Sequence, residues 1–357
     1  MAGYAVLFLT SYLLFLTFPK DTIMKPFLVL LLVLVLLTMA AGWYMARFAC
    51  RRKKNVPDYW THPEALPPVY KHIREEDRPE TLAGREFLLT HAEPPVYITS
   101  RDGLKLQGHY IPAEGEYKDN PKGIYLQVHG YRSHPLCDFP GCVMDMHNDG
   151  YGLFQIDNRA LGGSEGTYIT FGILERYDTV DWCRYLEKRF PGMPVLLDGV
   201  SMGGATVMLA AGEDLPDNVR GIIADCGYTS PAAICKKVLK QWFRLPPFPI
   251  YYAAVLWIRI LAGVWFTLPG KSDRNRYRTG DATLALEKNK RPILIAHGQG
   301  DTFVPHWMSV ENHSHCDPGN SVFISVPDAE HGMAWLEDRD RYTAEIHRLW
   351  EKVRSTM

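Results

Sequence analysis

The motif GVSMG at residues 199–203 constrains this chain more than any other stretch, because a strand-like and a helix-like run flank it. The apolar run 194–197 before it reads as a buried strand, and residues 204–211 after it are small and apolar enough to begin a buried helix. A strand, a sharp turn and a helix around G-x-S-x-G are typical of a nucleophile elbow, which strains the serine backbone. Glycine on both sides of the turn leaves room where strand and helix nearly touch. Ser201 is therefore the candidate nucleophile.

Apolar runs of strand length alternate with helix-length stretches from residue 96 onward. We expect strands at 96–99, 104–111, 123–128, 152–156, 194–197, 221–224, 293–296 and 322–326, and helices at 174–190 and 339–354. The first two runs predict a hairpin, and the later repeats predict a mostly parallel sheet with helices on both faces, an α/β fold. Ligands bind such sheets at the carboxyl ends of the strands, which is where Ser201 lies.

The N-terminal region is long and apolar enough to reach a membrane. Residues 26–46 have the ~20 residues that a transmembrane helix needs, whereas residues 3–18 fall short of that length. We expect 3–18 to be a short partner span in a helical hairpin, with an interfacial helix or a signal peptide as alternatives. Five basic residues within 47–54 outnumber the two between the segments, which predicts a catalytic domain on the cytoplasmic side. The glycosylation sequon at 312–314 weakly opposes this orientation.

The composition divides the chain into three parts. Residues 1–54 form a membrane anchor, which makes the lipid bilayer a partner, and the proline-rich residues 55–95 form a tether and an arm that lies on the catalytic domain. The catalytic domain spans 96–357, with an insertion at about 229–283. Within it, residues 250–268 are strongly apolar, but a third span would pull the next strand out of the sheet. We expect a lid over the active site, with one face against the bilayer; a buried helix without a role in binding is the alternative.

Ser201 needs a base to take its proton and an acid to orient that base. Asp301 follows the strand 293–296 and His331 follows the strand 322–326, so both lie at the carboxyl edge of the sheet. Asp225, which ends the preceding strand, is the alternative acid. The backbone N–H groups of Met202 and Tyr131 are the expected donors to the oxyanion of an acyl-transfer reaction.

Other polar residues receive structural interpretations. His129 and His297 precede glycines at strand ends and are expected to shape turns, while His313, His315 and Cys316 match no metal spacing. The seven cysteines are scattered and are expected to be free thiols, with a 137–142 disulfide and a lipid-bearing Cys50 as alternatives. A net charge of −1 gives no reason to expect a nucleic-acid partner. Asp198 ends a buried strand and needs a partner that the sequence does not identify.

Five motifs occur in the order of a known family. They are Val128-His129-Gly130-Tyr131, Asp157-Asn158-Arg159 with Gly162-Gly163-Ser164-Glu165-Gly166, the Ser201 motif, Gly300-Asp301 and Glu330-His331-Gly332. From about residue 95 to 357 the chain resembles the α/β-hydrolase superfamily, and most closely bacterial membrane-anchored serine hydrolases of the serine-aminopeptidase-like group. The resemblance implies an α/β-hydrolase fold, a Ser-Asp-His triad, a cap after the sixth strand and no cofactor. Ala160-Leu161 departs from the glycine-histidine pair common in the family, which puts that loop's substrate contacts in question.

Together these features predict a membrane-tethered serine hydrolase. It would cleave a carboxylic ester with an acyl or otherwise hydrophobic group through an acyl-enzyme, with Ser201, His331 and Asp301 as the triad and no metal. A peptidase or amide hydrolase would need the same triad. A catalytically idle, membrane-attached binding module is the alternative from a different functional class.

Overall fold

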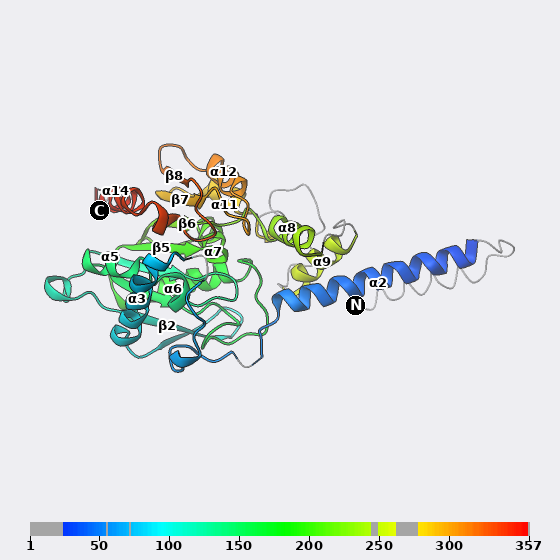
Figure 1. Cartoon of the computed structure of the whole chain (residues 1–357), viewed down its shortest axis with the longest axis horizontal. Coiled ribbons are helices and arrows are strands. Elements are labelled where there is room, and N and C mark those ends of the chain that lie inside the picture. The colour runs from blue at the N-terminus through cyan, green and yellow to red at the C-terminus, as the bar shows by residue number, and fades with distance from the viewer. Residues whose placement is uncertain (1–23, 55, 71–72, 244–248, 262–277, 356–357) are drawn as a thin grey trace.

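The computed structural model describes residues 24–54, 56–70, 73–243, 249–261 and 278–355. Eight strands form one sheet in the order β1-β2-β4-β3-β5-β6-β7-β8 (Figure 1). The strands are β1 (Val96–Thr99), β2 (Lys105–Ile111), β3 (Ile124–Val128), β4 (Gly152–Ile156), β5 (Val195–Val200), β6 (Val219–Asp225), β7 (Ile293–Gly298) and β8 (Ser321–Val326). β2 pairs antiparallel with β1 and with β4, and the other neighbours are parallel. The predicted hairpin and mostly parallel sheet are confirmed.

Helices cover both faces of the sheet. The described α-helices that follow α2 are α3 (Arg78–His91) in the arm and α4 (Pro135–Asp138), α5 (Val143–Asn148), α6 (Glu175–Arg189), α7 (Met202–Ala210), α8 (Pro231–Phe243), α9 (Ile250–Leu261), α11 (Ala282–Lys288), α12 (Trp307–Ser314), α13 (Ala334–Glu337) and α14 (Arg339–Ser355) in the catalytic domain. On β5, Val195 and Leu197 pack with α6, α7 and α11, whereas Leu196 points to the other face, toward α3, α5 and α14. Alternating strand residues feed two cores, which explains why the strands read as unbroken apolar runs.

The N-terminal helix α2 (Met24–Cys50) projects from this body (Figure 1). It contains the predicted span 26–46 and is the one helix among the described residues that is long and apolar enough to cross a membrane. Most of its large apolar side chains between Phe27 and Leu37 are exposed in the protein alone. The segment 3–18 lies outside the described residues.

The cap helix α9 lies along α2. A Cβ at Gly42 would stand 2.5 Å from the Ala253 Cβ, so glycine permits the close approach of the two helices. Trp257 Nε1 donates a hydrogen bond of 3.0 Å to the Met39 carbonyl. With 12 residues α9 is too short to span a bilayer by itself. The last part of the expected lid, 262–268, lies outside the described residues.

The arm before the sheet lies on the catalytic domain and contains a helix that the sequence analysis missed. In α3, Phe87 and Leu88 pack into the core beneath the sheet, and a Cβ at Gly84 would stand 1.9 Å from the Pro140 carbonyl oxygen. A proline at the start of α3 is compatible with a helix because the first N–H has no partner there. The proline-rich composition predicts a tether and an arm but does not indicate this helix.

Candidate active site

Ser201 occupies a strained turn between β5 and α7. Its φ of 59° and ψ of −116° are unfavourable for a residue with a Cβ, and they aim the side chain out of the turn. A Cβ at Gly203 would stand 1.8 Å from the Val128 carbonyl oxygen, and one at Gly199 would stand 2.4 Å from the Gly203 oxygen. Only glycine fits at these two positions, as the motif predicts.

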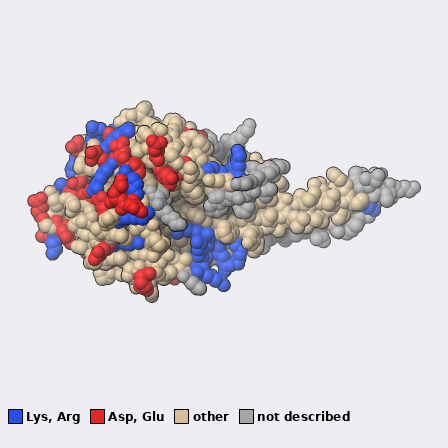
Figure 2. All heavy atoms as spheres, viewed as in Figure 1, with Lys and Arg blue, Asp and Glu red and all other residues tan. Residues whose placement is uncertain are grey.

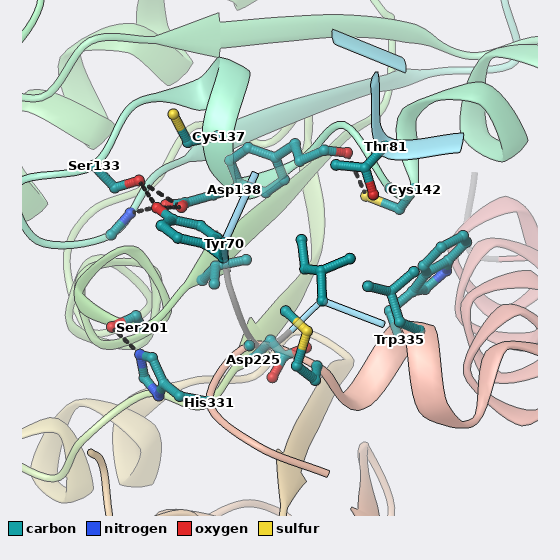
Figure 3. Close-up of a pocket in the computed structure, with 18 of the residues that line it drawn as sticks. Tyr70, Thr81, Ser133, Cys137, Asp138, Cys142, Ser201, Asp225, His331 and Trp335 are labelled. Atoms are coloured by element: carbon teal, nitrogen blue, oxygen red, sulfur yellow. Dashed lines mark hydrogen bonds between the residues drawn. The ribbon is translucent and has the colours of Figure 1, made fainter. Parts of the chain in front are cut away.

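The structure brings Ser201, His331 and Asp301 together in one chain of hydrogen bonds. His331 Nδ1 lies 2.6 Å from Asp301 Oδ2, and because a carboxylate only accepts, Nδ1 carries the proton. His331 Nε2 is then the acceptor for the Ser201 hydroxyl at 2.9 Å (Figure 3). This is the arrangement in which an imidazole removes a serine proton.

Asp301 is held by more donors than the sequence indicated. The N–H groups of Phe303 and Val304 each donate to Oδ1 at 2.8 Å. His297 Nε2 lies 3.0 Å from Oδ2, on the oxygen that also accepts from His331. Burial alone would raise the pKa of Asp301, but the two histidines hold it below its ordinary value. His297 was expected only to shape a turn, so its contact with Asp301 was missed. Its position four residues before Asp301 is the sequence signal that could have indicated this contact.

We call the hydrogen-bonded chain Ser201–His331–Asp301 the relay. Asp225, the alternative acid, lies near the relay, but no hydrogen bond to His331 is recorded for it among the described residues. Its Oδ2 accepts from the Tyr342 hydroxyl at 3.3 Å, and its backbone carbonyl accepts from Ser201 N–H at 2.8 Å. Burial raises the pKa of Asp225 to about 6, although His297 and His331 nearby act to lower it. The geometry favours Asp301 as the acid.

The two expected oxyanion donors flank Ser201. Met202 is the first residue of α7, and the first N–H groups of a helix have no partner within it. Tyr131 lies in the loop after β3, which Gly130 N–H fastens to Asp138 Oδ2 at 2.6 Å. The Tyr131 ring stacks on Phe171 with centroids 5.1 Å apart, and its hydroxyl donates to the Ala49 carbonyl of α2 at 2.7 Å. The loop is therefore tied to the end of the N-terminal helix.

Two cavities meet at Ser201. The first, which we call the apolar cavity, has a volume of about 260 Å³ and lies between the end of α2, the cap helices and Ser201. Its lining includes Tyr44, Met45, Phe48, Phe171, Tyr228, Ile234, Val238, Ala254, Ile258 and Phe303. The second, the inner cavity, has a volume of about 210 Å³ and extends over the sheet face that carries Asp198 and Asp225 (Figure 3). Its lining includes Tyr70, Ile73, Thr81, Met146, Trp335, Leu336 and Tyr342.

Asp198 has a partner in the structure. Gln127 Nε2 donates to its Oδ2 at 3.0 Å, and Gln155 Nε2 donates in turn to Gln127 Oε1 at 2.8 Å. The three side chains form a polar row across β5, β3 and β4, within the core. Burial raises the pKa of Asp198 to about 7, against the opposing effect of the hydrogen bond from Gln127.

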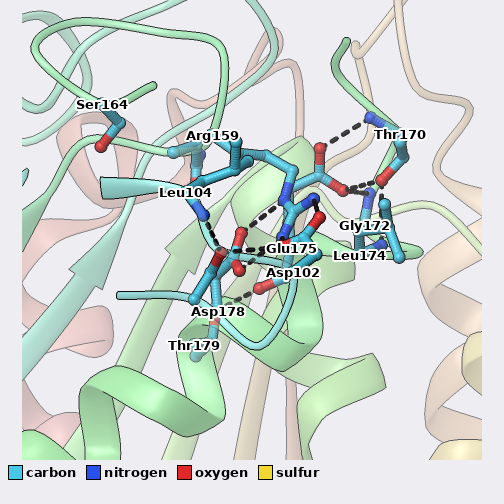
Figure 4. Close-up of polar contacts among 12 residues, drawn as sticks. Asp102, Leu104, Arg159, Ser164, Thr170, Gly172, Leu174, Glu175, Asp178 and Thr179 are labelled. Atoms are coloured by element: carbon cyan, nitrogen blue, oxygen red, sulfur yellow. Dashed lines mark hydrogen bonds and ion pairs between the residues drawn. The ribbon is translucent and has the colours of Figure 1, made fainter. Parts of the chain in front are cut away.

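The departure at Ala160-Leu161 lies outside both cavities. Both residues are buried against the cap-facing core that also contains Met202. The preceding Arg159 forms paired hydrogen bonds with Asp178 (2.6 and 2.7 Å) and Asp102 (2.8 and 3.0 Å), which join this loop to α6 and to the β1–β2 turn (Figure 4). This loop therefore supports the site without lining it.

Two groups of side chains among the described residues have metal-like spacing. One contains Asp301 and His331 with Cys226 and coincides with the relay. The other joins Asp58, His134 and Asp157, where His134 Nε2 lies 3.2 Å from Asp157 Oδ1 and Leu136 N–H donates to Nδ1. Both ring nitrogens of that histidine thus already face protein groups.

The remaining candidates have structural surroundings. His313 stacks on Phe323, and His315 contacts Glu287. All seven cysteines are free, which contradicts the alternative disulfide 137–142, and Cys50 is fully buried, a position that does not favour the lipid-bearing alternative.

Comparisons with known proteins agree with this architecture. A family model described as serine aminopeptidase, S33, matches residues 119–278, a range that contains Ser201 and ends before Asp301. Two similar bacterial proteins carry names that describe them as uncharacterised. YfhR of Escherichia coli K12 is 24% identical over 238 residues, 66% of this chain and 72% of that protein. YqkD of Bacillus subtilis is 22% identical over 259 residues, 72% of this chain and 78% of that protein.

Solved structures share the fold at low sequence identity. The esterase Pf2001 of Pyrococcus furiosus superposes with a TM-score of 0.56 at 18% identity, covering 80% of this chain and 98% of the esterase. The acylaminoacyl peptidase of Pyrococcus horikoshii gives a TM-score of 0.51 at 17% identity, covering 72% of this chain and 41% of the peptidase.

Proposed function

We propose that this chain, a member of the α/β-hydrolase superfamily, is a membrane-tethered serine hydrolase that cleaves carboxylic esters of hydrophobic acyl groups. The observation that carries the proposal is the relay of hydrogen bonds from Ser201 through His331 to Asp301. A serine in a strained turn, within 2.9 Å of an imidazole whose tautomer a carboxylate fixes, is equipped for nucleophilic attack.

The reaction follows from these positions. His331 Nε2 takes the Ser201 proton as Oγ attacks the carbonyl carbon, and the N–H groups of Met202 and Tyr131 donate to the oxyanion that forms. The imidazolium, stabilised by Asp301, then gives its proton to the leaving alkoxide as the C–O bond breaks. Water attacks the acyl-enzyme by the same route, releasing the acid and restoring Ser201.

The apolar cavity supports an acyl chain as one part of the substrate. Its walls come from the end of α2, from the cap and from loops of the body, and Ser201 is among the residues that line it. Burial of a chain in such a cavity contributes about 0.8 kcal/mol for each CH₂ group. Because α2 also has the length of a membrane span, a chain that enters from the bilayer would reach Ser201 along the helix that anchors the protein.

The charges near α2 support a cytoplasmic catalytic domain, although not all of these side chains face outward. Basic side chains gather where α2 meets the body (Figure 2). Arg52 is directed into the domain, where its guanidinium donates to the Gly162 carbonyl at 2.7 Å. The sequon at 312–314 is a poor argument for the opposite orientation, because Asn312 is fully buried and donates to the Gly227 carbonyl at 3.3 Å.

Substitution of the nucleophile tests the proposal. Ser201→Ala should abolish hydrolysis of p-nitrophenyl butyrate and labelling by a fluorophosphonate probe, whereas Ser314→Ala, at an exposed serine of α12, should preserve both. Labelling that persists in Ser201→Ala would refute the assignment of the nucleophile. Absence of labelling in the folded parent protein would favour a binding role instead.

An amide substrate is the second candidate function. The matching family model is described as serine aminopeptidase, and one structural neighbour is an acylaminoacyl peptidase. The Ser201–His331–Asp301 relay can catalyse the cleavage of an ester bond or of an amide bond. Turnover of a p-nitrophenyl ester and of the p-nitroanilide with the same acyl group would decide between them, since an ester hydrolase should cleave the anilide orders of magnitude more slowly.

A further inference from the structure

The inner cavity has a chemical character that acyl-chain binding does not explain. Three aspartates line it, Asp138, Asp198 and Asp225, and none of the described residues that line it is Lys or Arg. Asp138 is already an acceptor for Gly130 N–H and for the Ser133 and Tyr70 hydroxyls. The other two carboxyls lie deeper, on the sheet itself.

The register of the sheet places Asp198 and Asp225 on one face. Val200 of β5 is paired with Asp225 of β6, so Asp198, two residues earlier, points to the same side as Asp225. Each is only 4% exposed. Neighbouring strands lie about 4.8 Å apart, so Asp225 stands one strand away from the Ser201 turn, within reach of a short substituent on the scissile bond.

Asp225 has an acceptor atom without a donor. Its Oδ1 is buried and receives no hydrogen bond from the described residues, while Oδ2 has only the Tyr342 hydroxyl at 3.3 Å. A buried carboxylate without partners is costly, so such groups are normally paired with a donor or a cation. Both Ser201 and Asp225 line the inner cavity, and Figure 3 shows Asp225 beside the Ser201–His331 pair.

Aromatic rings also line the inner cavity. Tyr70 lies across the cavity from Asp225, and Trp335 lies at its other end (Figure 3). Aromatic faces attract ammonium groups, most strongly where water is excluded. An acceptor without a partner, together with these rings and an excess of acidic groups, favours a cation over an anion or a plain alkyl group.

We propose that the inner cavity is the leaving-group subsite and that it binds an ammonium-bearing alcohol, with Asp225 as the counter-ion and Asp198 adding to the negative potential. This proposal rests on the proposed function and adds the second half of the substrate. The acyl chain lies in the apolar cavity, the cationic alcohol lies in the inner cavity, and the ester carbon between them faces Ser201.

A pair of isosteric esters tests the subsite. Butyrylcholine and 3,3-dimethylbutyl butyrate differ by a quaternary nitrogen in place of a carbon, and the ratio of their kcat/KM values is divided by the ratio of their hydroxide-catalysed rates. We expect this corrected ratio to exceed about 10 at pH 8 in the full-length protein in detergent. A corrected ratio near one would overturn the subsite, while continued hydrolysis of both esters would leave the proposed function standing. Failure to hydrolyse either ester or to react with the fluorophosphonate would count against both.

Substitution and pH give independent readings of the same ratio. Asp225→Asn should bring the corrected ratio toward one, whatever happens to the absolute rates, and Asp214→Asn, at an exposed acid, should leave it unchanged. An unchanged ratio in Asp225→Asn would exclude Asp225 as the counter-ion.

The ratio should also rise between pH 5 and pH 8 as Asp225, whose pKa burial raises to about 6, becomes charged. The titratable groups that surround Asp225 include His297, His331, Asp301, Asp198, Tyr342, Cys226 and Cys142. Both esters need the same His331 base, so this common requirement affects both rates alike and cancels in the ratio. A ratio that does not change with pH would contradict the counter-ion role.

Discussion

At the scale of single residues, Asp301 is where the hydrogen bonds of the site converge. One oxygen accepts from two backbone N–H groups, and the other is shared by His331 and His297. His297 does not touch Ser201 in these contacts. We assign it as a positioning residue that fixes the carboxylate on which the tautomer of His331 depends.

Removal of His297 should therefore reduce turnover without removing a reacting group. We expect His297→Ala to lower kcat about tenfold with a nearly unchanged KM, and His297→Gln, which retains an N–H donor, to restore part of the loss. With one donor fewer, Asp301 stabilises the imidazolium more strongly, so the acidic limb of the kcat/KM profile should move to higher pH. An unaltered pH profile would indicate a purely structural role.

Asp198 affects stability through its titration. Its pKa of about 7 in the folded protein lies above the value of ~3.9 in an unfolded chain, because burial favours the neutral form. The stability associated with this carboxyl is complete below pH 4 and is lost as the pH rises through 7. Asp198→Asn, which keeps an acceptor for Gln127, should raise the melting temperature by about 2–4 °C at pH 8 and by less at pH 5. A larger gain in melting temperature at pH 5 than at pH 8 would contradict this pH dependence. Asp214→Asn is the control variant.

At the scale of elements, the sequence predicts the helices and strands whose positions depend on local residue patterns. β1 and β4 have the predicted bounds, α6 is one residue shorter at each end, and α14 is one residue longer at its C-terminal end. The helix α3 was missed because its core contacts, through Phe87 and Leu88, are formed with segments distant in sequence. Propensity alone is a weak guide where tertiary packing decides.

The contact between α2 and α9 gives a prediction for the apolar cavity. Gly42→Ile would place atoms against the Ala253 and Ala254 backbone, so α9 must move away from α2. Since Ala254 and Ile258 line the apolar cavity, we expect KM for a p-nitrophenyl decanoate to rise about tenfold, with a smaller effect on the acetate. Ala40→Ile, at an exposed position of the same helix, controls for added bulk. Equal changes in KM for the decanoate and the acetate would contradict a link between the α2–α9 contact and the binding of the acyl chain.

At the scale of the whole molecule, the structure brings three sequence regions to one serine. The order of the motifs was sufficient to select Ser201, Asp301 and His331, which the structure joins by hydrogen bonds. It gave no sign that Tyr70 of the arm or Phe48 of α2 would line the cavities. Those contacts join residues far apart in sequence, 63 apart for Tyr70 and Ser133 and 82 apart for Tyr131 and Ala49, and no local period encodes them.

The side of the membrane on which the body lies has its own test. We expect a cysteine placed at the exposed position Asp119 to react with a membrane-impermeant maleimide only after the cells are permeabilised, because the basic residues after α2 favour the cytoplasm. The parent protein, whose seven cysteines are buried or half-buried, is the reference. Labelling in intact cells would reverse the proposed orientation.

The hydrogen bonds at the end of α2 have one more consequence. The carbonyls of Phe48, Ala49 and Arg51 accept from the side chains of Tyr131 and Arg132, in the loop that carries the proposed oxyanion donor. The apolar part of α2, residues 26–46, is about 32 Å long, close to the ~30 Å of hydrocarbon in a bilayer. In a thinner membrane α2 would adjust by tilting. Bilayer thickness would then act on the geometry of the oxyanion loop, and we expect turnover in vesicles to vary with the length of the surrounding lipid chains.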